Sequence, residues 1–173
     1  MWTKLKRLFK HRWLGDGAAQ RSLSPAALAK LTQDVQASET QHSGEIRIFV
    51  EGGLPLSYLW RDEPLSQIIR RRAVTQFGKL RVWDTAQNNG VLIYLLLAEH
   101  AIEIVADRGL NDKVAPAAWQ ALLDTMRGKF GRGEFDTGLR QAVAVVSDLL
   151  VTHFPLAADA DNPNELPDAP TVR

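Results

Sequence analysis

The feature that most constrains the fold is an apolar run in the middle of the chain, Val91–Ala98. Its residues are hydrophobic on both sides of an extended strand, so the strand must lie inside a sheet that is covered on both faces. After a short turn at Glu99 and His100, residues 102–106 alternate between apolar and polar, which predicts an antiparallel return strand. The run is shorter than the roughly 18 residues that a membrane-spanning helix needs.

Apolar periodicity on either side of this hairpin predicts four helices and one further strand. Ser24 and Pro25 are a favourable helix start, with a hydroxyl N-cap before a proline, and this helix runs to about residue 41. Residues 45–51 alternate as a strand, with Glu45 and Arg47 pointing away from the core. Further helices are predicted over 64–78, over 112–130 and from 135 to the proline at 155. This order predicts an α/β fold whose small mixed sheet has helices on both faces.

The charged residues are distributed unevenly, although the formal net charge is only +1. We therefore expect three parts: a basic amphipathic segment over 1–20, one domain over 21–155 and a disordered acidic tail over 156–173. The domain itself is close to neutral, so nucleic acid is not an expected partner. The chain has no cysteine, which excludes disulfides and thiolate metal ligands.

The basic segment places large apolar residues at helical spacing between lysines and arginines. This pattern is typical of an amphipathic helix on an anionic membrane surface or on a partner such as a membrane protein. Alternatively, its aromatic side chains pack back on the domain. The loop over 52–64 adds two aromatic residues that suit partner recognition. The predicted contact residues are Trp2, Lys4, Lys6, Arg7, Phe9, Tyr58 and Trp60.

The segment lacks the uninterrupted apolar stretch of a secretory signal. We therefore expect a cytoplasmic protein that can associate peripherally with the inner face of the membrane. The sequence has no glycine-rich dinucleotide motif, no Walker A motif and no nucleophile elbow. We accordingly expect no nucleotide and no organic cofactor. The basic run Arg70–Arg72 is expected to be a solvated helix face.

Two short motifs frame the predicted hairpin: Asn88-Asn89-Gly90 opens the central strand, and Asp107-Arg108-Gly109-Leu110 closes the return strand. With the segments 44–48, 130–135 and 153–155, they resemble the TPM domain, the family of the thylakoid lumen acid phosphatase and the photosystem II repair proteins. The likeness runs from about Leu23 to Pro155 and is that of a bacterial, cytoplasmic type of member. It implies a three-layer α/β/α fold, which agrees with the predicted order of elements.

The resemblance also implies a site at the end of the central strands, where acidic residues bind a divalent cation. Antiparallel strands bring the start of one and the end of the other to the same edge of the sheet, so the two motifs should meet there. Their side chains could instead serve only as turn residues and helix caps. This chain reads Asn88-Asn89 where many members have an aspartate before the asparagine. The predicted ligands for Ca²⁺ or Mg²⁺ are Asp84, Asn88, Asn89, Asp107 and Asp112.

Two functions fit these features. The first is a non-enzymatic module that acts in the maintenance or assembly of membrane proteins. The second is a metal-assisted, acid phosphatase-like hydrolase of phosphomonoesters, in which Asp84, Asp107 and Asp112 hold the cation and the cation activates water. The sequence assigns no catalytic residue beyond these ligands. The missing nucleophile motif and the missing phosphate loop favour the first function.

Overall fold

The sheet is the element around which the chain is arranged. The structure, a computed structural model, describes residues 8–11, 17, 21–157 and 162–173. Its four strands lie in the order β3-β2-β1-β4. Strands β1 and β2 are parallel, and β2 and β3 form the predicted antiparallel hairpin. The bounds are Ile46–Glu51 for β1, Val91–Leu96 for β2, Ala101–Ala106 for β3 and Thr171–Val172 for β4.

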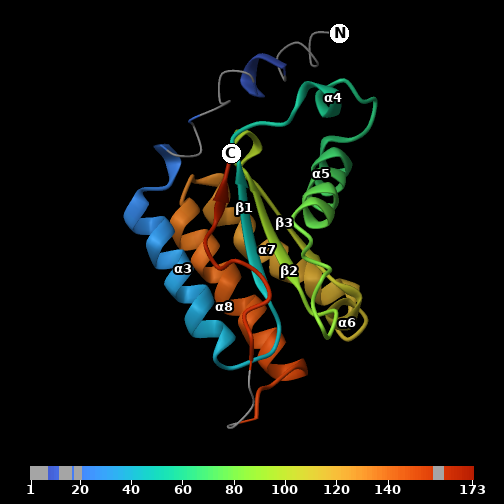
Figure 1. Cartoon of the computed structure of the whole chain (residues 1–173). Helices are drawn as coiled ribbons and strands as arrows, with labels where there is room; N and C mark the ends of the chain where they lie inside the picture. Colours follow the sequence, from blue (N-terminus) through green and yellow to red (C-terminus); the bar gives the residue numbers. More distant parts are fainter. Residues whose placement is uncertain (1–7, 12–16, 18–20, 158–161) are drawn as a thin grey trace.

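Helices cover both faces of this sheet, so the predicted three-layer α/β/α fold is confirmed (Figure 1). One outer layer consists of α3 (Pro25–Glu39), α7 (Pro116–Gly131) and α8 (Phe135–His153). The other consists of α4 (Leu56–Leu59) and α5 (Leu65–Lys79). The one-turn helix α6 (Arg108–Asn111) follows β3.

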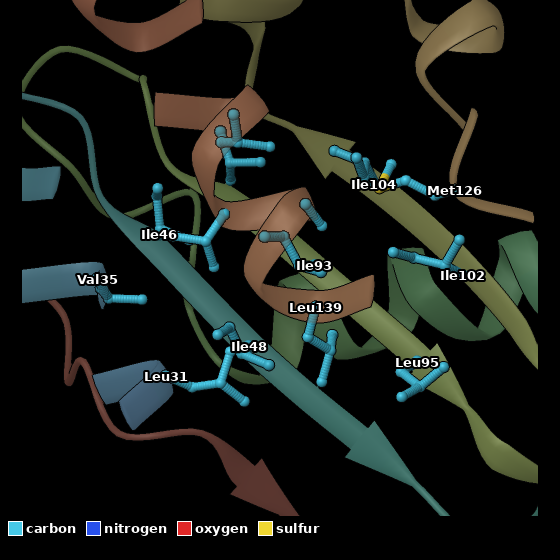
Figure 2. Close-up of a cluster of buried hydrophobic side chains, with 14 of the residues drawn as sticks. Leu31, Val35, Ile46, Ile48, Ile93, Leu95, Ile102, Ile104, Met126 and Leu139 are labelled. Atoms are coloured by element: carbon cyan, nitrogen blue, oxygen red, sulfur yellow. The ribbon is translucent and has the colours of Figure 1, made fainter. Parts of the chain in front are cut away.

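The continuous apolar character of β2 follows from this layered arrangement. Ile93 and Leu95 point into the core beneath α3, α7 and α8, as Figure 2 shows, while Tyr94 and Leu96 belong to the core beneath α5. All six residues of the strand are buried. Each successive side chain of a strand points to the opposite face, so a strand between two cores has no solvent-facing position.

A buried ion pair joins α5 to the sheet and corrects the prediction for the basic run. Arg70 and Arg71 are about half-exposed, but Arg72 is buried, with a side-chain exposure of 3%. Its Nε donates to Glu51 Oε2 at 2.9 Å and its Nη2 donates to Glu51 Oε1 at 2.5 Å. The Tyr94 hydroxyl donates to the same carboxylate at 2.7 Å. Arg72 lies one helical turn after Ile68, on the face of α5 that meets the sheet, so the helical phase buries it.

The structure also corrects the prediction that the acidic tail is disordered, because residues 162–173 have a defined path along the sheet. They run along the outer edge of β1 and end in β4, which pairs with β1 in parallel. Glu45 and Arg47, which the alternation predicts to point away from the core, are buried beneath them. The prediction of disorder rested on the low apolar content of the tail. The contacts that order it are mostly hydrogen bonds to its backbone.

Like charges meet where the tail passes over the end of α3. Glu39, Glu45 and Asp168 line one recess. Burial, together with the negative charges of Glu45 and Asp168, raises the pKa of Glu39 to about 8. Burial also raises the pKa of Glu45. Protonation of Glu39 therefore favours the folded arrangement.

Replacement of Arg72 tests the buried ion pair. Arg72→Met keeps the apolar stem but leaves the Glu51 carboxylate buried without its cation, so we expect a loss of about 3–5 kcal/mol in the free energy of unfolding. The neighbouring Arg71→Met removes only a half-exposed pair with Glu63 and should cost less than about 1 kcal/mol. Urea unfolding measures both. Equal losses in the two variants would contradict a specific role for Arg72.

The pH dependence of stability tests the acidic recess. A raised folded-state pKa means that the stabilisation by Glu39 is fully present below its unfolded value near 4.5 and is lost as the pH rises towards 8. Glu39→Gln should abolish this loss, so that between pH 5 and pH 8.5 the wild type loses roughly 1–3 kcal/mol more than the variant. Urea unfolding at the two pH values measures the difference. Glu134→Gln, at an exposed carboxylate on the far side of the sequence from this recess, should keep the wild-type dependence.

Candidate functional site

The base of the hairpin brings the two motif segments together as predicted. Val91 pairs with Ala106 in the strand register. Beyond this pair, the Asp107 amide donates to Gly90 O at 2.9 Å, and the Gly109 amide donates to Asn88 O at 2.8 Å. The loop before β2 and helix α6 after β3 thus form one continuous rim at this edge of the sheet (Figure 1).

Glycine is required in the rim for close approach of the backbone. A Cβ at Gly109 would lie 2.5 Å from Asn88 O, and a Cβ at Gly90 would meet Val82 O even more closely. Neither glycine has a positive φ, whereas Asn88 does, at 52°. The two motif glycines therefore let the segments touch, and Asn88 makes the left-handed turn that asparagine tolerates better than most residues.

Asn89 is fully buried and its amide orientation is fixed. Its Nδ2 donates to Ser43 O at 3.0 Å, which only the nitrogen of the amide can do. Its backbone amide donates to Thr85 Oγ1 at 3.1 Å. Its Oδ1 is buried and has no hydrogen-bond partner among the residues that the structure describes. Most buried acceptors are hydrogen-bonded, so this oxygen is a candidate acceptor for a bound water or cation.

Asp107 and Asn88 share a single arginine. One carboxylate oxygen of Asp107 accepts from the Arg108 amide at 2.8 Å and caps α6, while Oδ2 is buried and has no partner in the part of the chain that the structure describes. The Arg108 guanidinium donates to Asn88 Oδ1 at 2.9 Å. The rim thus offers two unpartnered oxygens, Asn89 Oδ1 and Asp107 Oδ2, beside one positive charge.

The remaining predicted ligands, Asp84 and Asp112, are exposed to solvent. Asp84 is exposed and forms an ion pair with Arg81 at 2.5 Å. Asp112 is exposed and ends α6. Over the part of the chain that the structure describes, no three carboxylate or imidazole side chains are placed to hold a metal ion together. The three predicted carboxylates are therefore not gathered, and cation binding itself stays a prediction.

Comparison with known protein families matches residues 19–149 to the TPM domain. The chain belongs to the TPM domain family. Among solved structures, it is similar to the NMR structure of the BA42 protein from the psychrophilic bacterium Bizionia argentinensis, with a TM-score of 0.71 and 26% sequence identity. That match covers 87% of this chain and 95% of the BA42 chain. No curated protein matches this TPM domain significantly.

The opposite end of the TPM domain carries the described part of the predicted contact surface. Trp60, at the end of α4, is 70% exposed, and Phe9 is 72% exposed. Tyr58 is instead held in place, because its hydroxyl bonds Thr75 Oγ1 at 2.8 Å and its ring lies 5.0 Å from the Arg61 guanidinium. The other four predicted contact residues, Trp2, Lys4, Lys6 and Arg7, lie outside the described residues.

An imidazole fixes the short helical turn 8–11 to this end of the TPM domain. The Leu54 amide donates to His11 Nδ1 at 3.0 Å, and His11 Nε2 lies 2.8 Å from Glu99 Oε1. Lys10 Nζ donates to the other oxygen of Glu99 at 3.0 Å. Burial alone would raise the pKa of Glu99, but these two partners lower it below its ordinary value. Sequence reasoning missed this contact, because nothing local connects His11 with a residue 88 positions away.

A recess of about 810 Å³ lies between α5 and α7, along the outer edge of β3. Sequence reasoning did not indicate it. Arg70 is one of its lining residues, and its Nη1 donates to Ile104 O at 2.5 Å and lies 3.4 Å from Glu103 Oε2. Burial raises the pKa of Glu103 even though Arg70 and Arg127 lower it. The side chain of Arg70 thereby covers part of the open edge of β3.

The part of the chain that the structure describes has no helix that is both long and apolar enough to cross a membrane.

Proposed function

We propose that this protein is a non-enzymatic TPM module that acts in the maintenance or assembly of membrane proteins, and that it docks at the inner face of the membrane through the end that carries α4. The observation that supports this is a set of exposed apolar side chains at that end. Phe9, Leu56 and Trp60 are 72%, 57% and 70% exposed. Figure 1 shows α4 and the helical turn 8–11 at the same end of the molecule.

Basic groups beside these side chains support an anionic membrane surface as the target. Lys10 and Arg61 keep side-chain exposures of 48% and 37%. The sequence places further lysines and arginines just before them in residues 1–7. Aromatic residues flanked by cations are favoured at the boundary between water and lipid, where the ring enters the interface and the charge meets the headgroups.

The rim at the other end supports a weak cation site better than a hydrolase. Asn89 Oδ1 and Asp107 Oδ2 could accept Ca²⁺ or Mg²⁺ together with water. A hard cation held for catalysis usually has more carboxylates than this. Arg108 and the pair between Arg81 and Asp84 further reduce the negative charge at the rim. The alternative, a metal-assisted phosphomonoester hydrolase, has these two oxygens as its support.

Vesicle sedimentation tests the docking surface. Trp60→Ser should weaken binding to vesicles of phosphatidylcholine and phosphatidylglycerol roughly tenfold, because burial of one tryptophan in the interface contributes about 1.5 kcal/mol or more. Trp83→Ser is the control, since Trp83 is also an exposed tryptophan, at 49%, but lies in the loop before β2. Equal sedimentation of wild type and Trp60→Ser would contradict the proposal.

A calcium titration followed by NMR tests the rim. At millimolar Ca²⁺, we expect shifts confined to the amides of residues 88–90 and 107–109, because the two unpartnered oxygens lie there. Asp107→Asn should abolish the shifts, while Asp112→Asn, at an exposed carboxylate of the same helix, should leave them unchanged. Shifts spread over all exposed carboxylates would indicate non-specific binding. An absence of shifts, with no hydrolysis of a generic phosphomonoester, would remove both the site and the hydrolase alternative.

A further inference from the structure

The outer edge of β1 is covered by residues 162–173 in the manner of a bound peptide. Phe49 and Val50 pair in parallel with Thr171 and Val172. The Arg173 amide donates to Val50 O at 2.9 Å, and the Gly52 amide donates to Arg173 O at 2.8 Å. An extended segment that adds a strand to an exposed sheet edge is a recurrent way in which proteins bind peptides.

Two charged side chains at the start of β1, Glu45 just before the strand and Arg47 within it, bind the backbone of this segment. The carboxylate of Glu45 accepts from the amides of Glu165 and Leu166, both at 3.2 Å. The Arg47 guanidinium donates to Pro167 O and, at 2.7 Å, to Ala169 O. These bonds are made to main-chain groups that any extended polypeptide presents.

Two side chains of the segment add selectivity. Leu166 is 7% exposed and belongs to the core beneath α5. Thr171 Oγ1 accepts from Arg47 Nη2 at 2.7 Å. The edge therefore suits an extended segment with one apolar residue and, five positions later, a hydroxyl.

The two edges of the sheet are covered in different ways. The outer edge of β3 is covered by the side chain of Arg70, which donates to Ile104 O. The outer edge of β1 is closed by backbone from a remote part of the chain. Like charges also oppose the docking of this backbone, since Asp168 shares a recess with Glu39 and Glu45. Repulsion between these carboxylates therefore opposes part of the binding of residues 162–173 to the edge of β1.

We infer that the outer edge of β1 is a binding site for an extended peptide segment of a partner protein, and that residues 162–173 occupy it as an intramolecular competitor. The partner segment has an apolar side chain in the place of Leu166 and a hydroxyl in the place of Thr171. Glu45 and Arg47 are its main-chain anchors. The inference is independent of the membrane proposal, because it involves no lipid and none of the residues around α4.

Binding of a fluorescent peptide with the sequence of residues 162–173 tests the inference. In the wild-type chain the tethered segment competes at an effective concentration on the order of millimolar, so the free peptide should bind weakly. Leu166→Asp in the full chain places a carboxylate beside Glu45 and should release the competitor. We therefore expect the peptide to bind this variant at least about tenfold more tightly than the wild type, as measured by fluorescence anisotropy.

Two controls restrict the result to the edge of β1. Addition of Arg47→Met to the Leu166→Asp chain should reverse the gain, because the peptide loses its guanidinium anchor. A peptide that itself carries Leu166→Asp should bind neither chain. If the Leu166→Asp chain has the wild-type circular dichroism but binds both peptides equally, or binds neither, the inference is overturned.

The wild-type chain supplies a measurement that does not depend on the folding of a variant. With labelled protein and millimolar unlabelled peptide, the amide signals of Glu165 and Leu166 should shift as their own segment is displaced. Signals that stay unchanged would overturn the inference. Concentration-dependent dimers of the wild type that disappear in Leu166→Asp would identify a second copy of the chain as the occupant and overturn the assignment to a different protein.

Discussion

The burial of charged residues on β1 determines how the outer parts of the molecule attach to the sheet. Glu45, Arg47 and Glu51 all belong to or adjoin this strand, and their exposures are 1%, 8% and 2%. A charge taken out of water is tolerated only when it is paired or fully hydrogen-bonded. Glu51 obtains Arg72 of α5, and Arg47 obtains the backbone of the tail. One strand thus fixes both a helix layer and the fourth strand.

The rim at the base of the hairpin follows from a different constraint, the close approach of two backbone segments. Gly90 and Gly109 make this approach possible, and the hydrogen bond from the Gly109 amide to Asn88 O holds it. The rim would form whether or not a ligand binds there. Substitution of the side chains around such a rigid contact can change what the rim binds without changing its backbone.

Most of the fold could be predicted from the sequence because its elements are long and periodic. The strand at Val91, buried on both faces, and the helix that Ser24 caps and Pro25 begins are examples in which local chemistry and tertiary structure agree. Strand β4 could not be predicted, since two residues carry no period. The burial of Arg47 could not be predicted either, since alternation indicates which side of a strand a residue faces but not what covers that side.

The candidate site was predicted in part for a similar reason. Antiparallel pairing brings Asn88 next to Asp107, and this required only the hairpin. Whether a nearby carboxylate joins them depends on its side-chain partners. Asp84 has an arginine three residues earlier in the sequence, and the ion pair that it forms is a local alternative to a shared site. Partners that lie far apart in sequence, such as His11 and Glu99, leave no local pattern at all.

The attachment of His11 has a consequence for which side of the N-terminal turn faces outwards. The imidazole accepts a hydrogen bond from the Leu54 amide at Nδ1, so in its neutral form it donates from Nε2 towards Glu99. A lysine or arginine has no acceptor and could not replace it. Because two residues correspond to about 200° around a helix, an inward His11 directs Phe9 to the opposite side. A single imidazole thereby sets the rotational orientation of the aromatic ring that this end of the molecule presents.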